Sequence, residues 1–212
     1  MEHDYQLIFE KLFNQYGPQN WWPADSPFEM MIGAILVQNT NWRNADKALR
    51  NLGNLLEPEI MFHMSETELA ERIRSSGFYR LKAKRIKAFM EWFNSYHFCV
   101  ENIKKRDKDT LRNELLQING IGRETADVML VYAFEKPVFV VDAYARRIFY
   151  RLGYDMPATY DAFRQQVEEH FPSDVQLYNE FHALLDEHAK NICRKKPLCS
   201  KCPLKDVCAQ RF

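Results

Sequence analysis

The sequence predicts an all-α protein, and two observations carry this prediction. Apolar residues recur at helical spacing along most of the chain, and no alternating strand pattern persists. Only seven glycines occur in 212 residues, which argues against a turn-rich β fold. The chain is 46% hydrophobic and 27% charged, which are ordinary values for a globular protein.

The composition also limits the functional classes. The formal net charge is zero, so any argument for nucleic-acid binding must rest on local features. The aromatic content of 14% is high, so some rings are candidate stacking surfaces. The N-terminal stretch has no basic n-region, and the longest apolar run, 30–37, is too short to span a bilayer. We therefore expect a cytoplasmic protein, nucleoid-associated in a bacterium, and a monomer.

The first half of the chain contains two capping boxes and one apolar stripe. Ser26-Pro27-Phe28-Glu29 reads as a capping box with proline at the first helical position. The helix that follows, to about Val37, is apolar on all sides and should be central. Ser65 and Glu68 form a second capping box, which opens a helix expected to stop near Gly77. A further helical stripe follows at Ile86, Phe89, Met90 and Phe93.

The stretch LLQINGIGRETADVML, residues 115–130, predicts two helices joined by a short turn. Amides of a Gly-x-Gly turn that opens a helix point outward together and form an anion site. Gly120 and Gly122 alone would fit an ordinary αα-hairpin equally well. The wider pattern L-x-x-I-x-G-I-G-x-x-T-A indicates a helix-hairpin-helix over 111–134, which holds a DNA phosphate without reading sequence. Arg123 and Thr125 belong to this candidate phosphate site.

Asp142 follows four apolar residues and should start a helix that runs to about Leu152. Its simplest role is that of an N-cap, which would also keep it ionised. An ionised carboxylate in an apolar surround can stabilise a sugar oxocarbenium ion. Arg146 and Arg147, one turn later, are either a solvated face or phosphate contacts.

The C-terminal tail carries four cysteines with C-x5-C-x2-C-x5-C spacing: Cys193, Cys199, Cys202 and Cys208. Two disulfides are the simpler alternative, which a cytoplasmic chain disfavours. Zinc and a [4Fe–4S] cluster both accept four thiolates. Only one close pair is present, and this favours the [4Fe–4S] cluster. Five basic residues in the tail either offset the cluster charge or face phosphates: Arg194, Lys195, Lys196, Lys201 and Lys205.

Taken in order, these motifs resemble the helix-hairpin-helix-GPD superfamily of DNA glycosylases, in the endonuclease III branch. The resemblance implies a two-lobed, all-α fold with DNA in the cleft. It places a six-helix barrel domain at 19–134 and an iron–sulfur cluster domain at 1–18 and 135–212. Asp142 matches the catalytic aspartate of the family, and Gln38 matches the residue that fills the gap left by a flipped nucleotide. Phe78 falls at the position of an apolar wedge, although a core contact at a helix junction is the alternative.

Glu124 is a departure from the endonuclease III pattern. That branch carries a lysine here, in a GRKTA context, whose amine attacks C1′ and allows strand cleavage. A glutamate cannot form the imine. The resemblance therefore implies a glycosylase without lysine-dependent lyase activity, although another amine in 82–87 stays open.

A second resemblance concerns the base pocket. The stretch NWWPADSPFEMMIGAILVQNTNW is similar to the 3-methyladenine DNA glycosylase of the same superfamily, which also lacks the lysine. That likeness places the flipped base among Trp21, Trp22, Pro23 and Trp42; a lid over the core is the alternative for the first two. The iron–sulfur cysteines belong to the other branch, so the sequence combines features of both.

The expected reaction is hydrolysis of the glycosidic bond of an alkylated purine, which leaves an abasic site. An aromatic cage attracts a cationic base, and Asp142 stabilises the oxocarbenium ion or activates water. Glycosylases for oxidised or mismatched bases and a non-catalytic binder of damaged DNA are the alternatives. Two basic clusters are expected either to contact phosphates or to form solvated faces: Lys82/Lys84/Arg85/Lys87 and Lys104/Lys105/Arg106.

Overall fold

The fold is wholly helical over the part of the chain that the structure describes. A computed structural model describes residues 4–22 and 24–212, and every regular element in those ranges is an α-helix or a short 3-10 helix. This confirms the prediction of an all-α protein. In the same ranges, no helix combines the length and apolar character that crossing a membrane would need.

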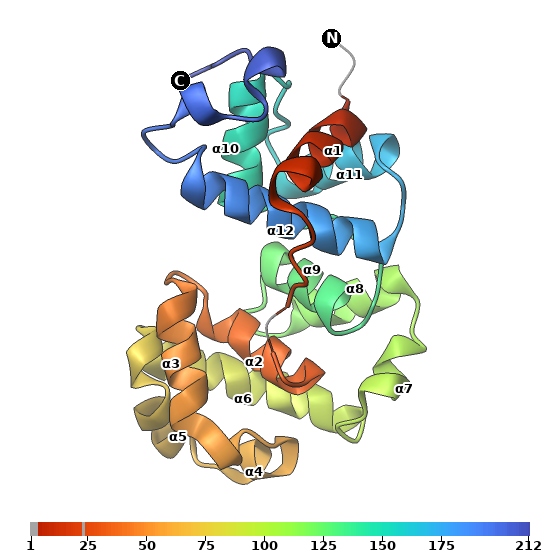
Figure 1. Cartoon of the computed structure of the whole chain (residues 1–212). Coiled ribbons are helices and arrows are strands. Elements are labelled where there is room, and N and C mark those ends of the chain that lie inside the picture. Colours follow the sequence, from red (N-terminus) through yellow and green to blue (C-terminus); the bar gives the residue numbers. More distant parts are fainter. Residues whose placement is uncertain (1–3, 23) are drawn as a thin grey trace. The chain divides into compact units, whose positions relative to one another are not determined.

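The helices fall into two compact units (Figure 1). The discontinuous unit comprises Met1–Trp21 and Pro137–Phe212, so it joins the N-terminal segment to the C-terminal part of the chain. The central unit is the continuous stretch Trp22–Lys136. The assignment of a six-helix barrel to 19–134 and of a cluster domain to the remainder stays a prediction.

The discontinuous unit is built around its last long helix. Its elements are α1 (Tyr5–Tyr16), α10 (Ala143–Leu152), α11 (Tyr160–His170), α12 (Val175–Asn191), η3 (Cys199–Lys201) and η4 (Lys205–Val207). Helix α12 contacts both α1 and α10 (Figure 1). Aromatic rings fill the core between them, with Tyr5 edge-on to Phe149 at a centroid distance of 5.1 Å. The α-helices α1 and α12, which are far apart in the sequence, are thereby packed against each other.

The central unit surrounds the apolar helix α2. Its elements are α2 (Pro27–Leu36), α3 (Trp42–Leu52), η1 (Gly53–Leu55), α4 (Pro58–His63), α5 (Glu66–Arg72), η2 (Arg74–Ser76), α6 (Tyr79–Ser95), α7 (Val100–Lys104), α8 (Lys108–Gln117) and α9 (Arg123–Tyr132). Eight of the ten residues of α2 are buried, and this helix contacts α3, α6 and α9. The prediction of a central helix that ends near Val37 is therefore confirmed.

Both predicted serine N-caps form, but the second helix is shorter than expected. The Ser26 hydroxyl accepts from the Glu29 amide at 3.1 Å, and the Ser65 hydroxyl accepts from the Glu68 amide at 3.2 Å. Helix α5 ends at Arg72, and the 3-10 helix η2 follows, whereas the sequence predicted one helix to about Gly77. The Ser76 hydroxyl donates to the Ile73 carbonyl at 2.8 Å, and such local bonds compete with the α-helical pattern.

The hairpin between α8 and α9 forms as the sequence predicts. Its turn is closed by a hydrogen bond from the Ile121 amide to the Ile118 carbonyl at 3.0 Å, and Gly120 has a φ of +88°. A bidentate ion pair links the two helices. Arg112 Nε lies 2.6 Å from Asp127 Oδ1, and Nη2 lies 3.1 Å from Oδ2. Asp127 is fully buried, so this pair fixes the hairpin from inside.

Helix α10 starts at the predicted place. The four residues 138–141 are all buried, and they lead into Asp142, whose Oδ1 accepts from the Ala145 amide at 2.7 Å. The helix ends at Leu152, followed by Gly153 with a φ of +101°. Asp142 is thus the N-cap of α10.

Candidate functional site

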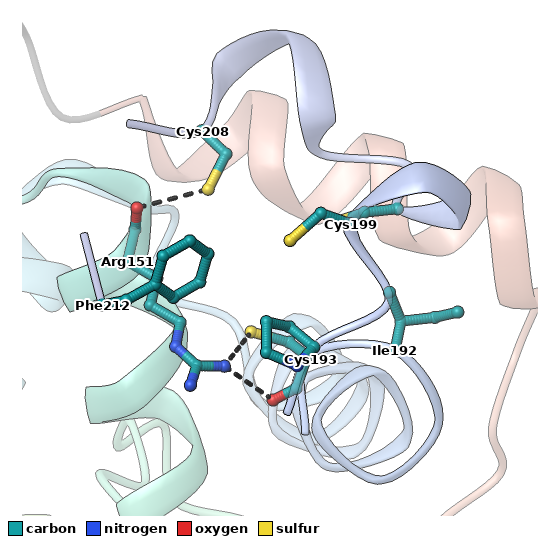
Figure 2. Close-up of a pocket in the computed structure, with 8 residues that line it drawn as sticks. Arg151, Ile192, Cys193, Cys199, Cys208 and Phe212 are labelled. Atoms are coloured by element: carbon teal, nitrogen blue, oxygen red, sulfur yellow. Dashed lines mark hydrogen bonds between the residues drawn. The ribbon is translucent and has the colours of Figure 1, made fainter. Parts of the chain in front are cut away.

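The four tail cysteines line one pocket in the discontinuous unit (Figure 2). Cys193 follows the end of α12, Cys199 starts η3, and Cys202 and Cys208 directly follow η3 and η4. Arg151 and Phe212 complete one side of the pocket. Short 3-10 turns bring thiols together here that are fifteen residues apart in the sequence at most.

Polar groups of neighbouring helices contact these thiols. Arg151 Nη1 donates to Cys193 Sγ at 3.4 Å, and Cys208 Sγ lies 3.2 Å from the Arg151 carbonyl (Figure 2). Cys202 Sγ lies 3.7 Å from Nε2 of His188. Burial raises the pKa of the Cys202 and Cys208 thiols, and the neighbouring cysteines add to this effect.

The thiols surround a space rather than meeting at one point. Among the described residues, no three His, Cys, Asp or Glu side chains are arranged to hold a single metal ion. The remaining cysteine, Cys99, precedes α7 in the central unit and is not part of this pocket. The four-cysteine group predicted from the spacing is therefore brought together.

Asp142 uses its two carboxylate oxygens differently. Oδ1 is held by the helix amide, and Oδ2 lies 3.8 Å from Nε2 of His182 on α12. The Asp142 side chain is 15% exposed and that of His182 is 7% exposed. His182 was not predicted from the sequence. The sequence gives little sign of a role for His182, because a single histidine in a helical pattern cannot be distinguished from a core residue.

Trp21 packs in the same unit as Asp142. Its ring is edge-on to His182 at a centroid distance of 5.9 Å, and Lys190 Nζ lies 5.7 Å above it. Lys190 also pairs with Asp186 at 2.6 Å. Burial raises the pKa of Asp186, although Lys190 opposes that shift.

The other predicted pocket residues lie in the central unit. Trp22 is edge-on to Trp42 at 5.3 Å and to Tyr132 at 5.1 Å. The two tryptophan planes meet at 86°, so the rings contact each other directly in this structure. Tyr132 was not predicted, and it is the last residue of α9. Pro23 lies outside the described residues.

The hairpin turn and Gln38 form one hydrogen-bonded cluster. Gln38 Nε2 donates to the Gly120 carbonyl at 3.0 Å and to the Thr125 hydroxyl at 2.9 Å. Its Oε1 accepts from Arg85 Nη1 at 2.6 Å. Gly122 is the N-cap of α9 and carries no side chain over the first amides of the helix. Arg123 is exposed beside this turn.

Phe78 and Glu124 are both exposed. Phe78 precedes α6 with a φ of +44°, and 67% of it is exposed, so the alternative of a core contact is excluded. Its conformation lies in the left-handed region, which is uncommon for an aromatic residue. Glu124 stands in the first turn of α9, where an acidic side chain is favoured by the helix dipole.

A comparison with known proteins decides the family. The model of HhH-GPD superfamily base excision DNA repair proteins matches residues 32–173. A relative from Methanocaldococcus jannaschii, "Putative DNA repair glycosylase MJ1434", is 46% identical over 209 residues, which cover 96% of this chain and 95% of the relative.

The chain belongs to the HhH-GPD superfamily.

As an HhH-GPD protein, the chain is a DNA glycosylase of base excision repair. Solved structures agree with this membership. The Helicobacter pylori 3-methyladenine DNA glycosylase MagIII, bound to 1,N6-ethenoadenine, is 31% identical with a TM-score of 0.75, covering 87% of this chain and 96% of that one. A trapped endonuclease III–DNA covalent intermediate is 25% identical with a TM-score of 0.83, covering 99% and 97%. The predicted resemblance to both branches is confirmed.

The members of the basic cluster Lys82/Lys84/Arg85/Lys87 differ in burial and in hydrogen-bond partners, so they do not form one charged surface. Lys82 is 1% exposed and donates to the carbonyls of Leu36 and Ser76, at 2.7 and 2.6 Å. Lys87 bonds to carbonyls at the end of α4, among them that of Met64 at 2.9 Å. These two lysines are neither phosphate contacts nor a solvated face, because they bind main-chain oxygens at helix ends. Lys84 is the one member of this cluster that is exposed, and Arg85 is intermediate in exposure.

Among the other basic residues named from the sequence, some bond to carboxylates or main-chain carbonyls, and others are exposed. Lys104 pairs with Glu135 at 2.7 Å, and Arg106 pairs with Glu114 at 2.9 Å. Arg146 donates to the carbonyls of two loop residues, and Arg147 donates to Cys193 O at 3.0 Å. Both side chains are only partly exposed, so a solvated face does not describe them, and a phosphate contact through their remaining N–H groups stays a prediction. The five basic residues of the tail are all exposed.

Proposed function

We propose that this chain is a monofunctional DNA glycosylase that removes an alkylated purine, such as 3-methyladenine, from DNA. The observation that carries the proposal is the identity of the residues at two positions, 142 and 124, both of which are acids. Asp142 is a carboxylate fixed as the N-cap of α10. Glu124 occupies the position at which a lysine would add strand cleavage. The chain therefore has an acid for hydrolysis at residue 142, and it has no amine at residue 124 that could form an imine.

Asp142 is assigned the chemical role. Its Oδ1 is held by the Ala145 amide at the start of α10, which fixes the carboxylate and leaves Oδ2 for the reaction. Oδ2 then stabilises the positive charge that develops at C1′ as the glycosidic bond breaks, or accepts a proton from the attacking water. Water supplies the hydroxyl group at C1′. The base leaves with the bonding electron pair, and a cationic alkylated base leaves as a neutral molecule.

The aromatic residues support the choice of an alkylated purine. Trp22, Trp42 and Tyr132 give electron-rich surfaces that contact each other in the central unit. A ring cluster of this kind attracts a cationic base through cation–π interactions. MagIII, which is named as a 3-methyladenine DNA glycosylase, shares 31% identity with this chain. A base stacked among these rings requires the edge-on pair Trp22/Trp42 to separate.

The lysines near the hairpin support the absence of lyase activity. Lys82 lies in the stretch where another amine was left open, but it is 1% exposed and bound to two carbonyls. Lys87 is likewise engaged with carbonyls at the end of α4. Neither of these two amines is presented as a nucleophile. Lys84 is the exposed lysine of this stretch, so the trapping experiment below must include a Lys84 variant.

The tail cysteines are proposed to hold a [4Fe–4S] cluster. The donor set fits, because four thiols line one pocket and no described group is arranged for a single ion. Cys193, Cys199, Cys202 and Cys208 would be the ligands. When bound, such a cluster supplies a rigid thiolate-ligated centre that can also exchange electrons.

A base-release screen tests the substrate. Duplexes carrying single alkylated, oxidised, deaminated or mismatched bases should show release of the alkylated purine. The Asp142→Asn variant should lose roughly 100- to 1000-fold in the single-turnover rate, while its affinity for an abasic-site duplex is kept. Preferred release of oxidised or mismatched bases would establish the endonuclease III-like alternative. Binding without release of any base by the native protein would establish a non-catalytic binder.

Borohydride trapping on abasic DNA tests the absence of lyase activity. The native chain should give no covalent adduct, because Glu124 has no amine. Glu124→Lys should produce an adduct, since the exposed first turn of α9 would then carry a primary amine. Trapping by the native chain that one lysine variant abolishes would contradict this part of the proposal.

A further inference from the structure

Arg85 contacts both the hairpin turn and Gln38, which were assigned separate roles in DNA binding. It lies on α6, and its stem crosses the hairpin turn so closely that a Cβ on Gly120 would lie 2.2 Å from Arg85 Cγ. Its Nη1 donates to Gln38 Oε1 at 2.6 Å. One side chain therefore contacts the candidate phosphate site and the candidate gap-filling residue.

Gln38 is fully engaged in this conformation. Both hydrogens of its amide nitrogen are used, one by the Gly120 carbonyl and the other by the Thr125 hydroxyl. Its oxygen accepts from a charged donor, which is the stronger class of hydrogen bond. Gln38 must give up these bonds before it can enter a duplex, and the bond to Arg85 is expected to be the most costly of them.

The charge around Arg85 is not balanced. In the part of the chain that the structure describes, Arg85 and Lys82 form no ion pair, and both of their positive charges lie near each other. Burial lowers the pKa of Lys82 to about 8, and the charge of Arg85 contributes to this shift. The Nε of Arg85 is also buried without a hydrogen-bond partner. An anion beside the turn would supply the missing negative charge.

We propose that Arg85 is a positioning residue that changes its partner when DNA binds. Its guanidinium leaves the amide oxygen of Gln38 for a phosphate at the hairpin turn, and this exchange releases the Gln38 side chain to enter the duplex. The inference rests on the proposed function as a DNA glycosylase, but it concerns binding and not bond cleavage. A guanidinium–phosphate contact joins two charges, so it can replace a bond to a neutral amide.

A double-mutant cycle in binding tests the exchange. The probe is a short duplex with one tetrahydrofuran abasic-site analogue, and the variants are Arg85→Met, Gln38→Ala and their combination. Methionine keeps an unbranched stem over Gly120 and removes the charge. In the wild type, binding must break the Arg85–Gln38 bond, and each single variant avoids that cost. The double variant should therefore lose roughly tenfold more affinity than the product of the two single losses.

The direction in which the double variant departs from the product of the single losses distinguishes this exchange from an Arg85–Gln38 bond that persists in the complex. If the two side chains stayed bonded in the complex, the losses would multiply; if the bond formed only on DNA, the double variant would lose less than the product. Either result would overturn the proposal. Lys84→Met is the matched control, because Lys84 is exposed on the same helix and does not contact Gln38. Its combination with Gln38→Ala should give the simple product even if Lys84 contacts DNA.

The salt dependence of binding gives a second readout. Arg85→Met should lower the slope of log affinity against log salt by roughly 0.9, the value of one phosphate contact on B-DNA. An unchanged slope would show that Arg85 does not reach a phosphate. Arg85→Leu, which has neither a charge nor a hydrogen-bond donor, replaces Arg85→Met if the latter does not fold, with the same expectations. Both tests measure DNA binding and not base release. A protein without glycosylase activity could therefore still show the predicted coupling, and an active glycosylase could lack it.

Discussion

Lys82 shows how a buried charge can serve a structural purpose. Its amine bridges the carbonyls of Leu36 and Ser76, the last residues of α2 and η2. A neutral amine retains two hydrogens, which suffice for the two carbonyls. This explains how the site tolerates a lysine whose pKa is lowered to about 8 by burial and by Arg85.

Lys82→Met should remove a pH-dependent part of the stability. Between pH about 8 and the unfolded value near 10.4, the unfolded chain binds more protons than the folded one, so the free energy of unfolding rises with pH. The variant should lack this rise. It should also be about 1–3 kcal/mol less stable near pH 7, because two carbonyls lose their donor. Urea unfolding from pH 7 to 10 measures both, with the exposed Lys84→Met as control.

The two hairpin glycines should respond differently to alanine. Gly120→Ala places a Cβ against Arg85 at a φ of +88°, and should cost about 1–3 kcal/mol. Gly122→Ala meets nothing within 4 Å, so the fold should be nearly unaffected. If a phosphate approaches α9 closely, Gly122→Ala should still weaken DNA binding. Thermal unfolding and DNA affinity, measured on both variants, separate the two effects; equal stability losses would contradict the steric account.

At the scale of elements, the hairpin depends on the ion pair between α8 and α9. Removing one partner, as in Arg112→Met, leaves a buried carboxylate at Asp127 and should cost about 3–5 kcal/mol. The double variant Arg112→Met/Asp127→Leu should be more stable than Arg112→Met alone, because it also removes the buried carboxylate of Asp127. Denaturant unfolding of the two variants is the measurement. A double variant that is less stable than the single one would show that the pair itself provides the net stabilisation.

Local signals predicted the helix starts well and some helix ends poorly. Ser26, Ser65 and Asp142 cap helices as expected, because a cap depends on a few neighbouring residues. Helix α5 gives way to η2, in which the Ser76 hydroxyl bonds back to Ile73, and periodicity does not reveal such local bonds. The buried roles of Lys82 and Lys87 could not be predicted either, since a lysine run looks the same whether its amines face solvent or carbonyl groups.

The candidate site was predicted unevenly for a similar reason. The cysteine group followed from spacing in one short segment, and the structure brings its members together. His182, Tyr132 and the Arg85–Gln38 bond join residues far apart in the sequence. Such contacts depend on how helices pack, and the sequence contains no local sign of them.

At the scale of the whole molecule, the tail should tie a cluster to the discontinuous unit. As-purified protein should be brown, with broad absorption near roughly 400 nm, as expected for a thiolate-ligated iron–sulfur cluster. Cys202→Ser should lose this colour, whereas Cys99→Ser should keep it, because Cys99 lies in the central unit. Absorption and iron analysis of both variants provide the measurement. A colourless native protein with one zinc would refute the assignment.

The packing of α1 against α12 has a consequence for the order of folding during synthesis. Helix α1 leaves the ribosome before the central unit, yet the helix that covers its apolar face spans Val175–Asn191. Its buried residues, among them Tyr5, Ile8 and Leu12, therefore wait without their native cover while more than 150 residues are translated. During that interval, the apolar residues of α1 are exposed to chaperones and to other nascent chains. The central unit, being continuous in sequence, has no such delay.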